Sequence, residues 1–125
     1  MNTDERRLAG MTEAILGCAF RVSNGLGSGF LEKVYENALA HELAKGGHDC
    51  VQQQRIEVRY DSVVVGEYFA DLLVDRRVIV ELKAVRGFDE VHVAQCLNYL
   101  KATWLSVCLL LNFGNPKLQV KRIVL

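Results

Sequence analysis

The chain has 125 residues, half of them hydrophobic and 24% charged, and its formal net charge is zero. We expect one domain spanning residues 1–125, because this length accommodates a single hydrophobic core but not two. The zero net charge argues against a protein that coats nucleic acid through charge alone, and it leaves room for a local basic groove. The four scattered cysteines, a charged start and the lack of a membrane-length apolar run predict a cytoplasmic protein.

Two helices are predicted in the first part of the chain. The first is expected to start with Thr12 as its N-cap and to end at NGLGSG, residues 24–29, where three glycines interrupt regular structure. The second is expected from about Phe30 to Lys45, before Gly46 and Gly47. Helical spacing predicts a core stripe for it that comprises Leu31, Val34, Ala38 and Leu43.

The rest of the chain alternates between strands and one helix. Three strands are predicted from Val51 to Tyr60, Val63 to Val74 and Arg77 to Lys83, with a turn at Asp61-Ser62. A helix capped by Asp89 should run to about Ala102, followed by strands from Trp104 to Asn112 and from Leu118 to Val124. The order helix, helix, three strands, helix, two strands predicts an α/β fold, with a mixed sheet flanked by helices.

The stretch VDRRVIVELKA, residues 74–84, places charge inside the most apolar strand. Glu81 and Lys83 alternate with Leu82, so they share one face of the strand. Asp71 interrupts the apolar run of the preceding strand in the same way. Two neighbouring acids in apolar strands repel each other unless one is protonated or a cation lies between them. Ligation by carboxylate oxygens alone favours magnesium or manganese over zinc.

The register of the hairpin tests this interpretation. Paired residue numbers in an antiparallel hairpin have a constant sum, so Asp71 opposes Glu81 only if Val74 pairs with Val78 across the loop Asp75-Arg76-Arg77. We expect this odd-length loop or a compensating bulge, because a two-residue loop would place the two acids on opposite faces.

With these residues in place, the chain resembles the PD-(D/E)xK nuclease superfamily, although Ala70 replaces the proline of that motif. The segment GFLEKVY, residues 29–35, resembles the signature of the GxxExxY protein family within it. Gln95 and Tyr99 in AQCLNYLKAT resemble the Q-x-x-x-Y element of the RecB-type branch. The resemblance covers about Leu16 to Leu125 and implies the restriction-endonuclease fold, a metal-dependent nuclease and a nucleic-acid substrate.

The resemblance also implies roles for single residues. Glu32, Asp71 and Glu81 would be metal ligands that converge on one ion, and Lys83 would orient or deprotonate the attacking water. Gln95 and Tyr99, one helical turn apart, would contact the ligands or the substrate, and so would Tyr35. Arg86 could hold a phosphate of the backbone.

Plainer interpretations stay open. Glu81 and Lys83 could form a structural ion pair, and Tyr35 and Tyr99 could be core aromatics with one bonded hydroxyl. The leading hypothesis is a magnesium- or manganese-dependent nuclease for DNA or RNA. The alternative is a catalytically weak or inactive module that binds nucleic acid or another partner and keeps the fold. A homodimer or a targeting partner protein is compatible with either.

Overall fold

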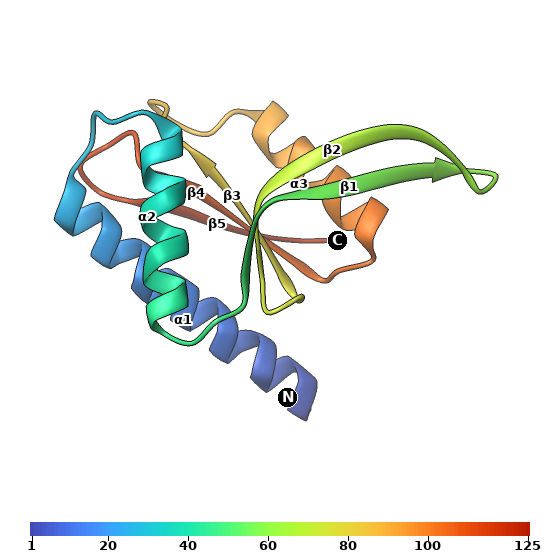
Figure 1. The fold of residues 1–125 in the computed structure, drawn as a ribbon, viewed down its shortest axis with the longest axis horizontal. Helices are drawn as coiled ribbons and strands as arrows, with labels where there is room; N and C mark the ends of the chain where they lie inside the picture. The colour runs from blue at the N-terminus through green and yellow to red at the C-terminus, as the bar shows by residue number, and fades with distance from the viewer.

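Three helices cover the two faces of a five-stranded mixed sheet in the computed structural model, which describes residues Met1 to Leu125 (Figure 1). The elements are, in chain order, α1 (Thr3–Leu26), α2 (Glu32–Lys45), β1 (Cys50–Tyr60), β2 (Val63–Val74), β3 (Val78–Lys83), α3 (Glu90–Thr103), β4 (Val107–Asn112) and β5 (Gln119–Val124). This order and the mixed α/β class confirm the predicted fold class. None of the helices is both long and apolar enough to cross a membrane.

Helix α1 starts earlier than predicted. Its N-cap is Asn2, whose side chain accepts a hydrogen bond from the Glu5 N–H at 2.8 Å, and Asp4 and Glu5 favour the positive end of the helix dipole. The predicted cap, Thr12, lies inside the helix and donates its hydroxyl to the Ala9 carbonyl at 2.9 Å. A threonine before an apolar run was therefore a misleading start signal, because an equally good cap stood ten residues earlier.

Helix α2 buries a different stripe from the predicted one. Leu31 precedes the helix and is 81% exposed, and Val34 is exposed as well. The buried face consists of Tyr35, Glu36, Leu39 and Leu43. The prediction is confirmed for Leu43, and Ala38 is partly buried against the core, whereas it was wrong for Leu31 and Val34. The sequence analysis did not place Glu36 in the core, because a glutamate is normally exposed.

The sheet has the order β1-β2-β3-β4-β5, with β3 and β4 parallel and the other neighbours antiparallel. Strand β4 is buried along its whole length, as a central strand covered on both faces should be. Helices α1 and α2 pack on one face, where Leu72, Val80 and Leu82 lie in their core. Helix α3 packs on the other face, with Ile79 and Leu110 in its core. Strand β5, predicted as a strand, lies at one edge of the sheet.

Helix α3 makes the crossover between the parallel strands β3 and β4. Asp89 caps it as predicted, accepting from the Val91 N–H at 3.0 Å, and His92 accepts from the Asp89 N–H to complete a capping box. The helix ends at Trp104, which adopts a left-handed conformation (φ 64°) and is not part of β4 as predicted. The isolated Trp side chain is 93% exposed.

Along the β1–β2 hairpin, the face of the sheet that even-numbered side chains cover changes near Gln53. Near its base, Cys50 and Leu72 pack on the α1 and α2 side, whereas Ile56 and Ala70 belong to the core on the α3 side. Regular alternation would keep all four on one face, since all have even numbers. The change occurs at Gln53, which faces Asp71 and has φ 54°, in the left-handed region. Beyond this point the hairpin leaves the other strands and projects from the body (Figure 1).

The chain segment after β3 is fixed by the end of β4. Asn112 holds both backbone groups of Val85: its Oδ1 accepts from the Val85 N–H at 3.0 Å, and its Nδ2 donates to the Val85 carbonyl at 2.8 Å. The Phe113 N–H donates to the Lys83 carbonyl at 2.8 Å. Gly114 lies directly against the Val85 backbone, where a Cβ atom would overlap main-chain atoms. The position of Lys83 therefore depends on the close approach of the Gly114 backbone to that of Val85.

We expect Gly114→Ala to lower the free energy of unfolding by about 1–3 kcal/mol or more, because the methyl group collides with the backbone of Val85 rather than with a flexible side chain. Gly10→Ala is the matched control: Gly10 lies inside α1 with open space around its Cβ position, so the same change should stabilise by about 0.5–1 kcal/mol. Urea unfolding of both variants measures the contrast. Equal effects of the two substitutions would contradict the proposed contact.

Candidate functional site

The β2–β3 hairpin places Asp71 opposite Glu81. Val74 pairs with Val78, Leu73 with Ile79 and Leu72 with Val80, so the three-residue loop and the register predicted from the sequence are confirmed. Beyond these pairs each acid accepts a hydrogen bond from the other strand. The Asp71 N–H donates to Glu81 Oε1 at 3.2 Å, and the Leu82 N–H donates to Asp71 Oδ2 at 2.8 Å. The two carboxylates are therefore neighbours with fixed orientations.

Both carboxylates hold protons more tightly than usual in the metal-free protein. Burial, followed by the charge of Asp71, raises the pKa of Glu81 from 4.5 to about 8, and only 4% of this residue is exposed. Burial also raises the pKa of Asp71, against the hydrogen bond from Leu82, and the charge of Glu36 adds to the increase. The raised pKa values therefore belong to the pair, because two like charges are buried side by side.

Lys83 lies beside this pair. Its Nζ is 3.6 Å from Glu81 Oε2 and donates to Gln95 Oε1 at 3.3 Å. The structure therefore brings Gln95, on α3, next to the lysine. The Lys83 side chain is 17% exposed, and it lines a hollow together with Gln95, His92 and Tyr68.

Tyr99 supports Glu81 from the buried side. Its hydroxyl lies 3.3 Å from Glu81 Oε2 and 3.4 Å from the Phe69 carbonyl, and the residue is 1% exposed. Burial raises the pKa of this hydroxyl, so it remains a hydrogen-bond donor. Tyr99 thus contacts a candidate ligand and is closed to solvent, which excludes direct contact with a substrate in this conformation.

Glu32 faces the site from the first turn of α2. Partial burial and the charge of Asp71 raise its pKa, while Lys83 and the backbone of Ala84 act in the opposite direction. Its carboxylate is thus within electrostatic reach of Asp71 and Lys83. The expected convergence of three acids on one position is not found, however, since no three His, Cys, Asp or Glu side chains are placed to hold a metal ion. Carboxylates without a cation between them repel one another, which favours this spread.

Two predicted contact residues lie elsewhere. Tyr35 is fully buried, stacks on Phe113 with ring centroids 4.8 Å apart, and donates its hydroxyl to the Gly27 carbonyl at 2.6 Å. It holds the glycine-rich loop that precedes Glu32, so the core-aromatic alternative describes it. The Arg86 side chain is exposed and makes no ion pair, and only its carbonyl is bonded, to Asn115 Nδ2.

A buried glutamate next to the site escaped the sequence analysis. Glu36 is 3% exposed, and its Oε2 accepts from Lys33 Nζ at 2.9 Å and from Gln52 Nε2 at 2.8 Å. Its Oε1 accepts from Gln53 Nε2 at 2.8 Å. The same amide nitrogen lies 3.3 Å from Asp71 Oδ1, so Gln53 bridges the two acids.

The left-handed backbone of Gln53 makes this bridge feasible. Adjacent strand residues normally point to opposite faces, yet the side chains of Gln52 and Gln53 both reach Glu36. Such a conformation is costly for a residue other than glycine and is often found near functional sites. The sequence feature that could have indicated this bridge is the run QQQ, residues 52–54. Three consecutive amides are unusual in a strand, where β-branched and aromatic residues are favoured.

One comparison with known proteins gives a match over most of the chain. The family model described as the PD-(D/E)XK nuclease superfamily matches residues 9–123, which is nearly the whole chain. The chain belongs to this superfamily. No curated protein and no solved structure matches it.

Membership in the nuclease superfamily makes a nuclease-like function the general expectation for this domain, and members typically use divalent metals. The side chains here are compatible with such an ion. They offer only oxygen donors, and the buried Asp71–Glu81 pair carries repulsion that a cation would relieve. The donor set of this nuclease-superfamily domain therefore suits a hard divalent cation, although its carboxylates are not gathered around one point.

The raised pKa of Glu81 predicts a pH dependence of stability in the metal-free domain. The folded state binds the Glu81 proton more tightly than the unfolded chain does. Protonated Glu81 therefore contributes fully to the free energy of unfolding below pH 4.5, and this contribution is lost as the pH rises to about 8. The slope from this group is at most about 1.4 kcal/mol per pH unit. We expect urea unfolding in EDTA to show the wild type losing stability relative to Glu81→Gln between these limits. Parallel pH profiles of the two proteins would refute the raised pKa.

Proposed function

We propose that this domain is a metal-dependent phosphodiester hydrolase, that is, a nuclease for DNA or RNA. The observation that carries the proposal is the pair of opposed carboxylates on β2 and β3 with Lys83 beside them. Pairing two acids inside apolar strands is unfavourable for a purely structural element, because each buried charge needs compensation. A function that requires both acids explains why the chain keeps them.

The proposed chemistry assigns a task to each side chain. Asp71, Glu81 and Glu32 would hold magnesium or manganese, which when bound stabilises negative charge on a phosphate and lowers the pKa of water. Lys83, which donates to Gln95, would orient the attacking water and stabilise charge on the phosphate as an ammonium group, or take a proton from that water as a neutral amine. Tyr99 and the Leu82 N–H fix the orientation of the two central carboxylates.

Within the superfamily, we propose that the chain is a GxxExxY-type member of the RecB-like branch. The contact between Lys83 and Gln95 and the bond from Tyr99 to Glu81 support this assignment, since both helix residues of the Q-x-x-x-Y element meet the site. A cytoplasmic location is proposed as well, on the ground that all four cysteines are unpaired.

The second candidate function is a catalytically weak or inactive module that binds nucleic acid or a partner protein. It is favoured by the carboxylates not being gathered for an ion and by the zero net charge of the chain. In this case Glu81 and Lys83 would form only a structural ion pair. A targeting partner or a second copy of the chain would then supply the catalytic activity or the charge that the domain lacks.

Thermal melts separate a metal site from a structural ion pair. A metal that binds only the folded state should stabilise the wild type by about 2.7 kcal/mol at a hundredfold excess over its dissociation constant. Asp71→Asn should leave the metal-free protein as stable or more stable, because repulsion with Glu81 falls, and should abolish the response to magnesium.

Asp61→Asn is the matched control, since it makes the same change in the β1–β2 turn, where the backbone is already left-handed. It should keep the full magnesium response. A structural ion pair requires the opposite pattern: no metal effect on the wild type and a clear loss of stability in Asp71→Asn.

Cleavage assays test the activity itself. Purified protein is incubated with labelled single-stranded, duplex and branched DNA and with RNA, with or without magnesium or manganese. We expect metal-dependent cleavage of at least one substrate, lowered about 10²- to 10⁴-fold in Lys83→Met, because proton transfer and charge stabilisation are lost together. Lys121→Met, on the exposed edge strand β5, is the control and should cleave normally. Absence of cleavage of every substrate with either metal would leave the binding module as the function.

A further inference from the structure

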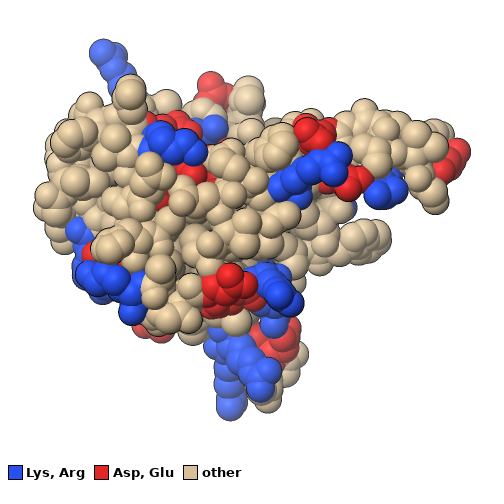
Figure 2. Space-filling model, in the orientation of Figure 1, with Lys and Arg blue, Asp and Glu red and all other residues tan.

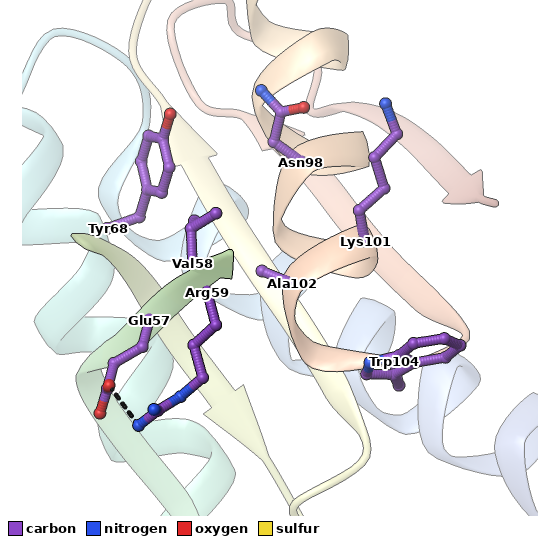
Figure 3. Close-up of a pocket in the computed structure, with 8 residues that line it drawn as sticks. All are labelled: Glu57, Val58, Arg59, Tyr68, Asn98, Lys101, Ala102 and Trp104. Carbon is purple, nitrogen blue, oxygen red and sulfur yellow. Dashed lines mark hydrogen bonds and ion pairs between the residues drawn. The ribbon is translucent and has the colours of Figure 1, made fainter. Parts of the chain in front are cut away.

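A groove runs from the candidate site along α3 beneath the projecting hairpin. Its outer part has a volume of about 560 Å³ and is lined by Glu57, Val58, Arg59 and Tyr68 of the hairpin and by Asn98, Lys101, Ala102 and Trp104 of α3 (Figure 3). Its inner part, of about 530 Å³, contains Lys83 and Gln95 and shares Tyr68 and Asn98 with the outer part. We call the two parts together the hairpin–α3 groove. One end of it therefore opens onto the lysine of the candidate site.

Two aromatic side chains of this groove are exposed without an evident structural reason. Trp104 is 93% exposed and occupies a left-handed C-cap, a position where glycine is the favoured residue. Tyr68 is 40% exposed and packs edge-to-face against the buried Tyr99, with ring centroids 5.9 Å apart. This contact fixes the position of the Tyr68 ring. Exposed aromatic faces of this kind are typical of surfaces on which unpaired bases stack.

The charge of the groove differs from that of the whole chain. Three cationic side chains and one carboxylate line it, whereas the chain has a formal net charge of zero. Glu57 is paired with Arg59 at 2.8 Å and Lys83 lies 3.6 Å from Glu81, so Lys101 is the one cation of the groove that makes no ion pair. Figure 2 shows the charges of the visible face mostly as adjacent positive and negative side chains, set within a largely uncharged surface.

We propose that the hairpin–α3 groove binds an unpaired strand of nucleic acid and leads it to Lys83. Bases in a duplex are stacked on one another, and only unpaired bases offer free faces to Trp104 and Tyr68. Lys101 and the Asn98 amide line the same groove and suit the phosphates and base edges of such a strand. Nine residue steps separate Gln95 from Trp104, or about 13 Å of helix, which matches about four stacked nucleotides.

The proposal rests on the nuclease function, because it names the substrate class of that same site, but binding can be measured without cleavage. Trp104 is the only tryptophan in the chain, so its fluorescence reports directly on the groove. In EDTA we expect single-stranded DNA or RNA to quench this fluorescence in a saturable way, and a duplex of the same sequence to quench it much less. Equal quenching by the duplex, or none by either single strand, overturns the proposal.

Substitutions separate stacking from folding. Trp104→Gly should be at least as stable as the wild type, because glycine suits the left-handed cap, yet it should bind a labelled single strand about 5- to 150-fold more weakly. Trp104→Phe keeps a ring and should lose less affinity. Lys101→Gln should reduce the salt dependence of binding by about one counterion, whereas Lys121→Gln on β5 should not change it. Unchanged binding by Trp104→Gly, measured by anisotropy in EDTA, overturns the proposal.

The outcomes distinguish the two proposals. Quenching and Trp104-dependent binding without metal-dependent cleavage keep the groove and reject the nuclease activity. Cleavage whose KM for single strands is the same in Trp104→Gly keeps the nuclease and rejects the groove. A Trp104 emission that shifts with protein concentration, together with a dimer in sedimentation that Trp104→Gly abolishes, assigns this surface to a second copy of the chain and also rejects the groove.

Discussion

The opposition of Asp71 and Glu81 across β2 and β3 is the constraint around which the site is arranged. Each carboxylate accepts a main-chain N–H from the other strand, so the hydrogen bonding of the sheet itself orients both acids. This arrangement buries two acids side by side, and this burial raises the pKa of both. Neighbouring elements then offset part of the cost: α3 supplies the Tyr99 hydroxyl, and Lys83 supplies a positive charge at 3.6 Å.

The second set of supports comes from the opposite side of the sheet and depends on one irregular residue. Gln53 turns its backbone into the left-handed region, and its amide thereby joins Glu36 on α2 to Asp71 on β2. The same irregularity reverses which face each later residue of β1 covers, so the outer hairpin bends over α3. A single unfavourable conformation thus both fixes an acid of the site and forms the roof of the groove beside it.

More of the candidate site than of the structure around it could be predicted from the sequence. Charges inside apolar strands identified Asp71 and Glu81, and the parity of an antiparallel hairpin was sufficient to predict the three-residue loop between them. Glu36 was missed because a charged residue on a helix is normally placed on the solvent face. Trp104 was placed in a strand because its apolar neighbours continue into β4, whereas its left-handed conformation depends on how α3 ends.

The lengths of the strands explain why the groove lies where it does. Strands β1 and β2 have 11 and 12 residues, whereas β3 has 6, so the outer half of the hairpin has no further strand to pair with. Its two strands are held there by each other, by Ile56 in the core on the α3 side, and by an ion network that joins Arg55 to Glu57 and Glu67. Cations and acids in this network neutralise one another, which leaves the hairpin without a field that could attract a duplex from a distance. Affinity for nucleic acid must then come from short-range contacts, and in this groove those are aromatic faces beside the unpaired Lys101.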